Sequence, residues 1–164
     1  MYISDVSENI RNLFEKLESK EIKDKLEFLI YVIDSIYNGH INEKNSANPS
    51  LEEDDIEIFS FEDIGLENKM CSDLVEFLLS LHDNRDNIMY DNGAIIGIDY
   101  NGCNDIIIKF ENLTFEEKLD VIAELMIEYD NDTYFNNDLK MSILKLNVSG
   151  YDIAEDIKKY KSRI

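Results

Sequence analysis

Residues that interrupt regular secondary structure are scarce in this chain. Its 164 residues include six glycines and a single proline, Pro49. Because glycine and proline are the strongest local signals for turns, their scarcity favours long helices joined by polar loops. No internal repeat of about 20 to 50 residues is present, which argues against a solenoid or a propeller. A chain of this length is typical of one domain, so residues 1–164 are predicted to form a single unit.

Helical periodicity of apolar residues is clearest towards the two ends of the sequence. A first helix is predicted to begin after Ser4 or Ser7, and a second extends from about Glu21 to Asn38, where Gly39 is a stop signal. The other predicted helices are residues 68–82, residues 114–129 after a capping box formed by Thr114 and Glu117, residues 134–146 and residues 151–161.

Between residues 87 and 110 the apolar pattern alternates instead, and Asp91-Asn92-Gly93 and Asn101-Gly102 are turn signals. Three-residue loops at 91–93 and 101–103 would set Tyr90 opposite Ala94 and would make one whole face apolar. We therefore predict a three-stranded antiparallel meander, in which residues 104–110 form the last strand. Its predicted inner face is Ile88, Tyr90, Ile96, Ile98, Tyr100, Ile106, Ile108 and Phe110, and its mixed outer face includes Met89, Ile95, Asp99, Ile107 and Lys109.

These patterns predict an α+β fold in which helices flank a small antiparallel β-meander of three to four strands. The fourth strand would be a short edge strand at 56–59. Along the chain, the prediction is a helical segment at 1–39, an acidic loop at 40–60, a helix at 68–82, the meander at 87–110 and a helical segment at 114–161.

Negative charge is concentrated in the middle of the chain. The sequence has 36 acidic and 16 basic side chains, for a net charge of −20, and residues 45–139 hold 24 of the acidic but only four of the basic groups. So many carboxylates repel phosphates, so we expect no binding to nucleic acid or to anionic membranes. No signal peptide or membrane-length apolar stretch is recognised, which favours a cytoplasmic protein.

Motifs for catalysis or metal binding are not found in the sequence. H-E-x-x-H, G-x-S-x-G, C-x-x-C and glycine-rich phosphate loops are missing. Cys71 and Cys103 are expected to be buried thiols, and neither His40 nor His82 has an obvious partner. The acidic stretch 130–135 lacks the glycine that an EF-hand needs. We therefore expect no enzyme activity, no metal and no cofactor.

The acidic segment is the candidate for a function. It is either a solvated, solubilising surface or a docking surface for a basic protein, where opposed charges accelerate association. Under the second interpretation the predicted partner-binding residues are Glu52, Glu53, Asp54, Asp55, Glu57, Glu62, Asp63, Asp91, Asp99 and Asp105.

The tract Glu52–Asp55, the acidic turns at Asp91, Asp99 and Asp105, and the lack of catalytic motifs support a comparison with a known class of proteins. In these features the chain resembles the immunity proteins of contact-dependent growth inhibition and other polymorphic toxin systems. The resemblance implies an inhibitor that binds a cognate toxin domain, frequently a basic nuclease, and covers its active site or an adjacent surface. Two alternatives stay open: an acidic nucleic-acid mimic or regulatory protein of a phage or mobile element, and an enzyme that uses a carboxylate-bound metal.

Overall fold

Helices account for most of the computed structural model, which describes residues 7–42, 58–65, 90–91, 94–95, 102–130 and 150–162. Within these residues, no helix is long and apolar enough to cross a membrane. The α-helices are α1 (Glu8–Glu18), α2 (Ile22–Tyr37), α4 (Asn104–Glu111), α5 (Phe115–Asp130) and α7 (Gly150–Lys161); a 3₁₀ helix, η3 (Phe61–Ile64), and two short strands, β1 (Tyr90–Asp91) and β2 (Ala94–Ile95), complete the list.

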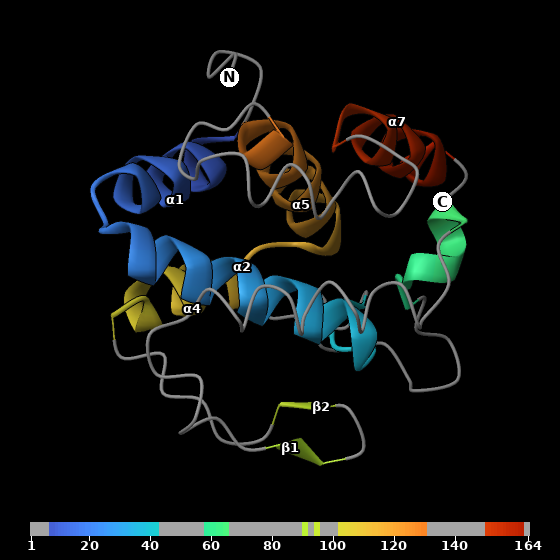
Figure 1. The fold of residues 1–164 in the computed structure, drawn as a ribbon. Coiled ribbons are helices and arrows are strands. Elements are labelled where there is room, and N and C mark those ends of the chain that lie inside the picture. Colours follow the sequence, from blue (N-terminus) through green and yellow to red (C-terminus); the bar gives the residue numbers. More distant parts are fainter. Residues whose placement is uncertain are drawn as a thin grey trace.

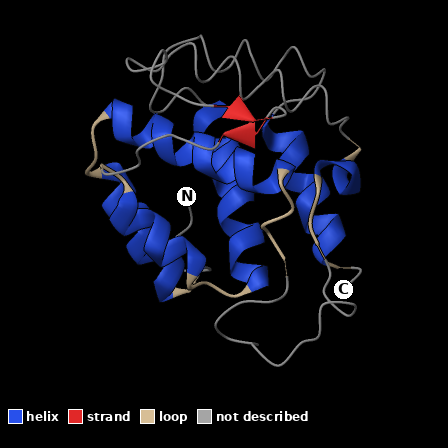
Figure 2. Ribbon diagram, turned by 90° about the horizontal axis from the view of Figure 1, so that it is seen from below, coloured by secondary structure: helices blue, strands red, loops and turns tan. Residues whose placement is uncertain are grey.

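The helices are arranged in two layers (Figure 1). Helices α1, α5 and α7 lie side by side, and α2 crosses beneath them with α4 next to it. The strand pair lies on the far side of α2, outside the helical layers, and Figure 2 shows how small a part it forms. A ring contact between Phe115 and Tyr160, with centroids 6.5 Å apart, places the end of α7 beside the start of α5. These two helices therefore run antiparallel.

Four helices agree with the predictions from the sequence. Helix α1 begins after Ser7, whose side chain accepts a hydrogen bond of 3.2 Å from the Ile10 backbone N–H. Helix α2 lies between Glu21 and Asn38 as expected. The capping box is confirmed, since the Thr114 N–H donates to Glu117 Oε1 at 3.0 Å and the Glu117 N–H donates to Thr114 Oγ1 at 3.2 Å. Helix α7 begins one residue before the predicted 151–161 segment.

The predicted α+β fold is wrong, because residues 104–111 form helix α4 and not the third strand of a meander. The helix buries Cys103, Ile106, Ile107 and Phe110, while Ile108 is 51% exposed. That spacing of three, one and three residues is the helical pattern, which the alternation of Ile106, Ile108 and Phe110 concealed. Packing selects the helix: Phe110 meets Phe28 of α2 edge to face, with ring centroids 6.0 Å apart. Of the loop predicted at 101–103, the structure describes residues 102 and 103, which form the turn that leads into this helix.

The strands that are described pair in a different register from the predicted one. Tyr90 lies opposite Ile95 and Asp91 opposite Ala94, so two residues, not three, separate the paired positions. Those two residues are Asn92 and Gly93 in the sequence, the strongest signal for a two-residue hairpin connection. The rest of the predicted meander before residue 102 lies outside the described residues.

Other predictions are met in part or fall outside the described chain. Of the edge strand at 56–59, the structure describes one antiparallel bridge, between Ile58 and Asn42, and a 2.9 Å hydrogen bond from the Phe59 N–H to the Ile41 carbonyl. Cys103 is buried as expected. The predicted helices at 68–82 and 134–146, and Cys71, are not among the described residues.

Candidate protein-binding surface

The structure separates the predicted partner-binding residues that it describes. Glu62 and Asp63 lie in η3, next to α7, whereas Asp105 lies in α4, which packs against α1. Figure 1 shows these two places at opposite ends of α2. Asp91 lies in β1, opposite Ala94. Outside the described residues are Glu52, Glu53, Asp54, Asp55, Glu57 and Asp99.

Asp105 is engaged within the molecule and is not in the acidic turn that the sequence predicted. Its Oδ2 lies 3.1 Å from Lys20 Nζ and 3.5 Å from Lys16 Nζ, at the end of α1. Burial alone would raise the pKa of Asp105, but the hydrogen bond and charge of Lys20 outweigh it and hold the pKa below its usual range. Asp105 therefore ties α4 to α1, which leaves less of its charge for a partner.

Asp63 has a similar local role in η3. Its Oδ2 accepts hydrogen bonds from the Ser60 backbone N–H at 2.7 Å and from the Ser60 hydroxyl at 3.2 Å. Glu62 beside it is exposed. Of the predicted residues Glu62, Asp63 and Asp105, the last two form contacts that stabilise the fold itself.

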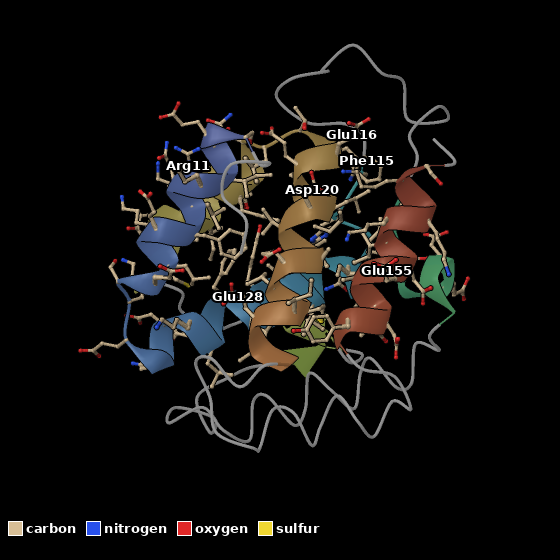
Figure 3. All side chains as sticks on the ribbon, turned by 90° about the horizontal axis from the view of Figure 1, so that it is seen from above. Arg11, Phe115, Glu116, Asp120, Glu128 and Glu155 are labelled. Atoms are coloured by element: carbon tan, nitrogen blue, oxygen red, sulfur yellow. The ribbon has the colours of Figure 1, made fainter. Side chains whose placement is uncertain are left out.

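A larger acidic surface, which the sequence analysis missed, lies along α5. Among the α5 side chains whose burial is described, those that are not buried are acidic except for the partly buried Ile127. Glu116 is exposed, and the half-buried ones are Glu117, Asp120, Glu124 and Glu128. We call these five carboxylates the α5 acidic stripe. Figure 3 shows α5 between α1 and α7, with Glu116 and Asp120 near one end of the helix and Glu128 near the other. With a rise of about 1.5 Å per residue, positions 116 to 128 extend over roughly 18 Å.

The only basic residue of α5 does not neutralise this stripe, because it points into the molecule. Lys118 is 7% exposed, and its Nζ lies 5.9 Å from the centre of the Phe110 ring. Burial lowers the pKa of Lys118, while the charge of Glu111 on α4 acts in the opposite direction. The cation thus belongs to the contact between α4 and α5, on the side of the helix away from the acidic stripe.

Glu128, in the second half of the acidic stripe, lies near other carboxylates. Burial raises the pKa of Glu128 above its usual value, and the negative charges of Glu124 and of Glu18 on α1 add to the rise. Within the described ranges, no lysine or arginine forms an ion pair with any of these three side chains. Like charges at i and i+4 also destabilise a helix, so this arrangement works against folding.

Helix α7 shows the ordinary way to solvate a charged helix face. Lys158 lies 3.6 Å from Glu155, and Lys159 lies 4.0 Å from Asp156, so opposite charges alternate at i and i+3. Such pairs are mildly stabilising. Solubility therefore does not require a run of carboxylates like the acidic stripe on the neighbouring helix.

Glu117 belongs to the acidic stripe and also has a structural role. Besides its part in the capping box, its Oε2 accepts a 2.6 Å hydrogen bond from the Ser7 hydroxyl, which joins α1 to α5. Burial alone would raise the pKa of Glu117, but the hydrogen bonds from Ser7 and Thr114 outweigh it and hold the pKa below its usual range. Its charged form is therefore favoured by folding.

From this shift we predict a loss of stability in acid that depends on Glu117. A carboxyl whose pKa is lowered in the folded state stabilises the protein above its unfolded pKa, and this contribution disappears as the pH falls through the folded pKa. Glu117→Gln keeps the capping geometry but loses the charge, so its free energy of unfolding should fall less between pH 6 and about pH 3. Urea unfolding at both pH values measures the difference. An identical fall in the variant and the wild type would contradict the prediction.

Neither metal nor thiol chemistry is supported in the part of the chain that is described. There, no three histidine, cysteine, aspartate or glutamate side chains are placed to hold a metal ion. Burial raises the pKa of the Cys103 thiol to about 12, and the negative charges of Glu27, Asp24 and Asp105 contribute. A thiol with so high a pKa is a poor nucleophile.

The acidic stripe could have been recognised in the sequence. Glu116, Asp120, Glu124 and Glu128 follow one another at intervals of four residues, which places them on one side of any helix. The apolar side of the same helix predicts that the segment is helical, and the opposite side carries these charges. Neither protein-family models, curated proteins nor solved structures match this chain, so the assignment of a function rests on its own residues.

Proposed function

We propose that this protein is an inhibitor of the immunity-protein type, which binds and neutralises a cognate, basic bacterial toxin domain. The observation that supports this proposal most directly is the α5 acidic stripe, whose carboxylates are exposed or half-buried while the only cation of the helix, Lys118, is buried. A basic surface that holds nucleic acid in a nuclease has the opposite charge and would be attracted to it.

The energetic cost of the stripe favours a functional explanation over a solubilising one. Repulsion between like charges four residues apart destabilises a helix by about 0.2–0.5 kcal/mol for each pair. The stripe contains three such pairs, Glu116–Asp120, Asp120–Glu124 and Glu124–Glu128. A cationic partner would remove this repulsion on binding, so the cost to the free protein would be recovered in the complex.

The inhibition would be stoichiometric and would need no catalytic residue. Lysine and arginine side chains of the toxin would pair with the stripe, and the partly buried Ile127 would lie within the contact. Long-range attraction would mainly raise the association rate, which should then fall as salt is added. The acidic tract Glu52–Asp55 remains a further predicted contact.

The proposal predicts that the same substitutions stabilise the free protein and weaken binding. Glu124→Gln with Glu128→Gln should raise the free energy of unfolding by a few tenths of a kcal/mol, because repulsion is removed. Association with a basic toxin domain that this protein inhibits should slow by about threefold or more at low salt, and protection against that toxin should weaken. Thermal unfolding and stopped-flow binding provide the two measurements.

A matched control removes two negative charges from α7 instead. Glu155→Gln with Asp156→Asn has the same effect on net charge, but both carboxylates already pair with lysines of their own helix. This variant should bind nearly as fast as the wild type and should not be stabilised. Equal slowing by both pairs of substitutions would show that only total charge matters and would refute a role of α5. A nucleic-acid mimic would instead compete with DNA for several unrelated basic proteins.

A further inference from the structure

One cation already lies on the α5 acidic stripe, and it comes from another helix. The Lys161 ammonium group, in the last turn of α7, contacts the Asp120 carboxylate. The two residues are 41 positions apart in the sequence. Lys158 and Lys159 of the same helix pair with carboxylates of α7 itself. Among the described ion pairs, the one that joins the stripe to a basic side chain is therefore the pair of Lys161 and Asp120.

We propose that Lys161 occupies, in the free protein, the position that a lysine or arginine of the basic partner takes in the complex. The partner would displace Lys161 from Asp120, so this contact would be an autoinhibitory one that weakens binding of cations. The inference rests on the proposed function, because it assumes that the stripe is the binding surface. It adds a specific position, Asp120, and a specific competitor.

The geometry of the pair makes displacement feasible. The side chain of Asp120 is 42% exposed and that of Lys161 is 24% exposed, so an incoming cation can reach the carboxylate. Exposed ion pairs are weak, and they alter an equilibrium constant by no more than about fivefold. Buried contacts hold α7 in place independently, since Ile153, Ala154, Ile157 and Tyr160 belong to the core. Lys161 can thus leave Asp120 without release of the helix.

The test compares two lysine substitutions that change the net charge equally. Lys161→Gln frees a carboxylate of the α5 stripe, whereas Lys158→Gln frees Glu155 on α7. The probe is a fluorescent oligo-arginine peptide, and its affinity is measured by anisotropy at low salt. We expect Lys161→Gln to bind the probe about two- to fivefold more tightly than Lys158→Gln. Equal affinities of the two variants, or weaker binding by Lys161→Gln, would overturn the proposal.

A second comparison separates competition from a purely structural role. In the Asp120→Asn background the contested carboxylate is gone, so Lys161→Gln and Lys158→Gln should have the same affinity for the probe. If Lys161→Gln still binds more tightly there, Lys161 does not act through Asp120, and the inference is wrong. The proposed function is tested separately by Glu124→Gln with Glu128→Gln. If these two changes slow binding while Lys161→Gln and Lys158→Gln have equal affinity for the probe, the α5 stripe is still supported as the binding surface and only the competition by Lys161 is refuted.

Discussion

Replacing Ile107 by alanine should lower the free energy of unfolding by about 2–5 kcal/mol, whereas Ile108→Ala should change it by less than about 0.5 kcal/mol. The two neighbours differ only in their environment, because Ile107 is 6% exposed and Ile108 is 51% exposed on α4. Removal of a buried isoleucine side chain leaves a cavity and loses apolar burial, while the same change on the surface does neither. Urea unfolding of both variants, with equal m-values as a check on the denatured state, measures the difference.

This pair of substitutions also decides between the helix and the strand at 104–111. In the predicted meander Ile108 would face the core together with Ile106 and Phe110, and Ile107 would lie on the outer face. The order of the two effects would then be reversed. A larger loss of stability for Ile108→Ala than for Ile107→Ala would therefore refute helix α4 and restore the strand.

Phe59→Ala should have the second large effect, a loss of about 3–5 kcal/mol in the free energy of unfolding. The Phe59 side chain is fully buried, and its ring meets Tyr160 of α7 with centroids 5.3 Å apart. Its N–H also donates to the Ile41 carbonyl, which joins the segment before η3 to the segment that follows α2. The substitution thus leaves a cavity where three parts of the chain meet. Urea unfolding measures the loss in the free energy of unfolding.

Ile58 supplies the matched control for Phe59. It precedes Phe59 directly but is 49% exposed, so Ile58→Ala should change the free energy of unfolding by less than about 0.5 kcal/mol. Binding of the oligo-arginine peptide should be unaffected in Ile58→Ala, since the α5 stripe is unchanged. A loss below about 1 kcal/mol for Phe59→Ala would show that this segment is not anchored in the core.

Local patterns predicted the helices whose signals lie within a few residues of one another. The Ser7 cap, the Thr114–Glu117 capping box and the apolar spacing of α2 and α7 each act over one or two helical turns. The same kind of local spacing holds the acidic residues of α5. These parts of the fold, and of the candidate surface, could be derived without knowledge of distant contacts.

The segment 104–111 shows where local patterns stop being sufficient. Ile106 and Phe110 fit both an alternating and a helical period, so the periodicity alone does not select one. The choice depends on Phe28 of α2 and on Lys20, which lies 85 residues from its partner Asp105. Tertiary packing routinely overrides such a weak local preference.

The sequence by itself determined the excess of negative charge, which is a matter of composition. It also determined the four helices with clear caps or apolar spacing and the acidic side of α5, because these depend on residues a few positions apart. Only the tertiary structure decided that residues 104–111 are helical, that Asp105 pairs with Lys16 and Lys20, and that Lys161 lies on Asp120. Each of these depends on residues far apart in the chain, so spacing along the sequence does not reveal which carboxylates the fold pairs with a cation.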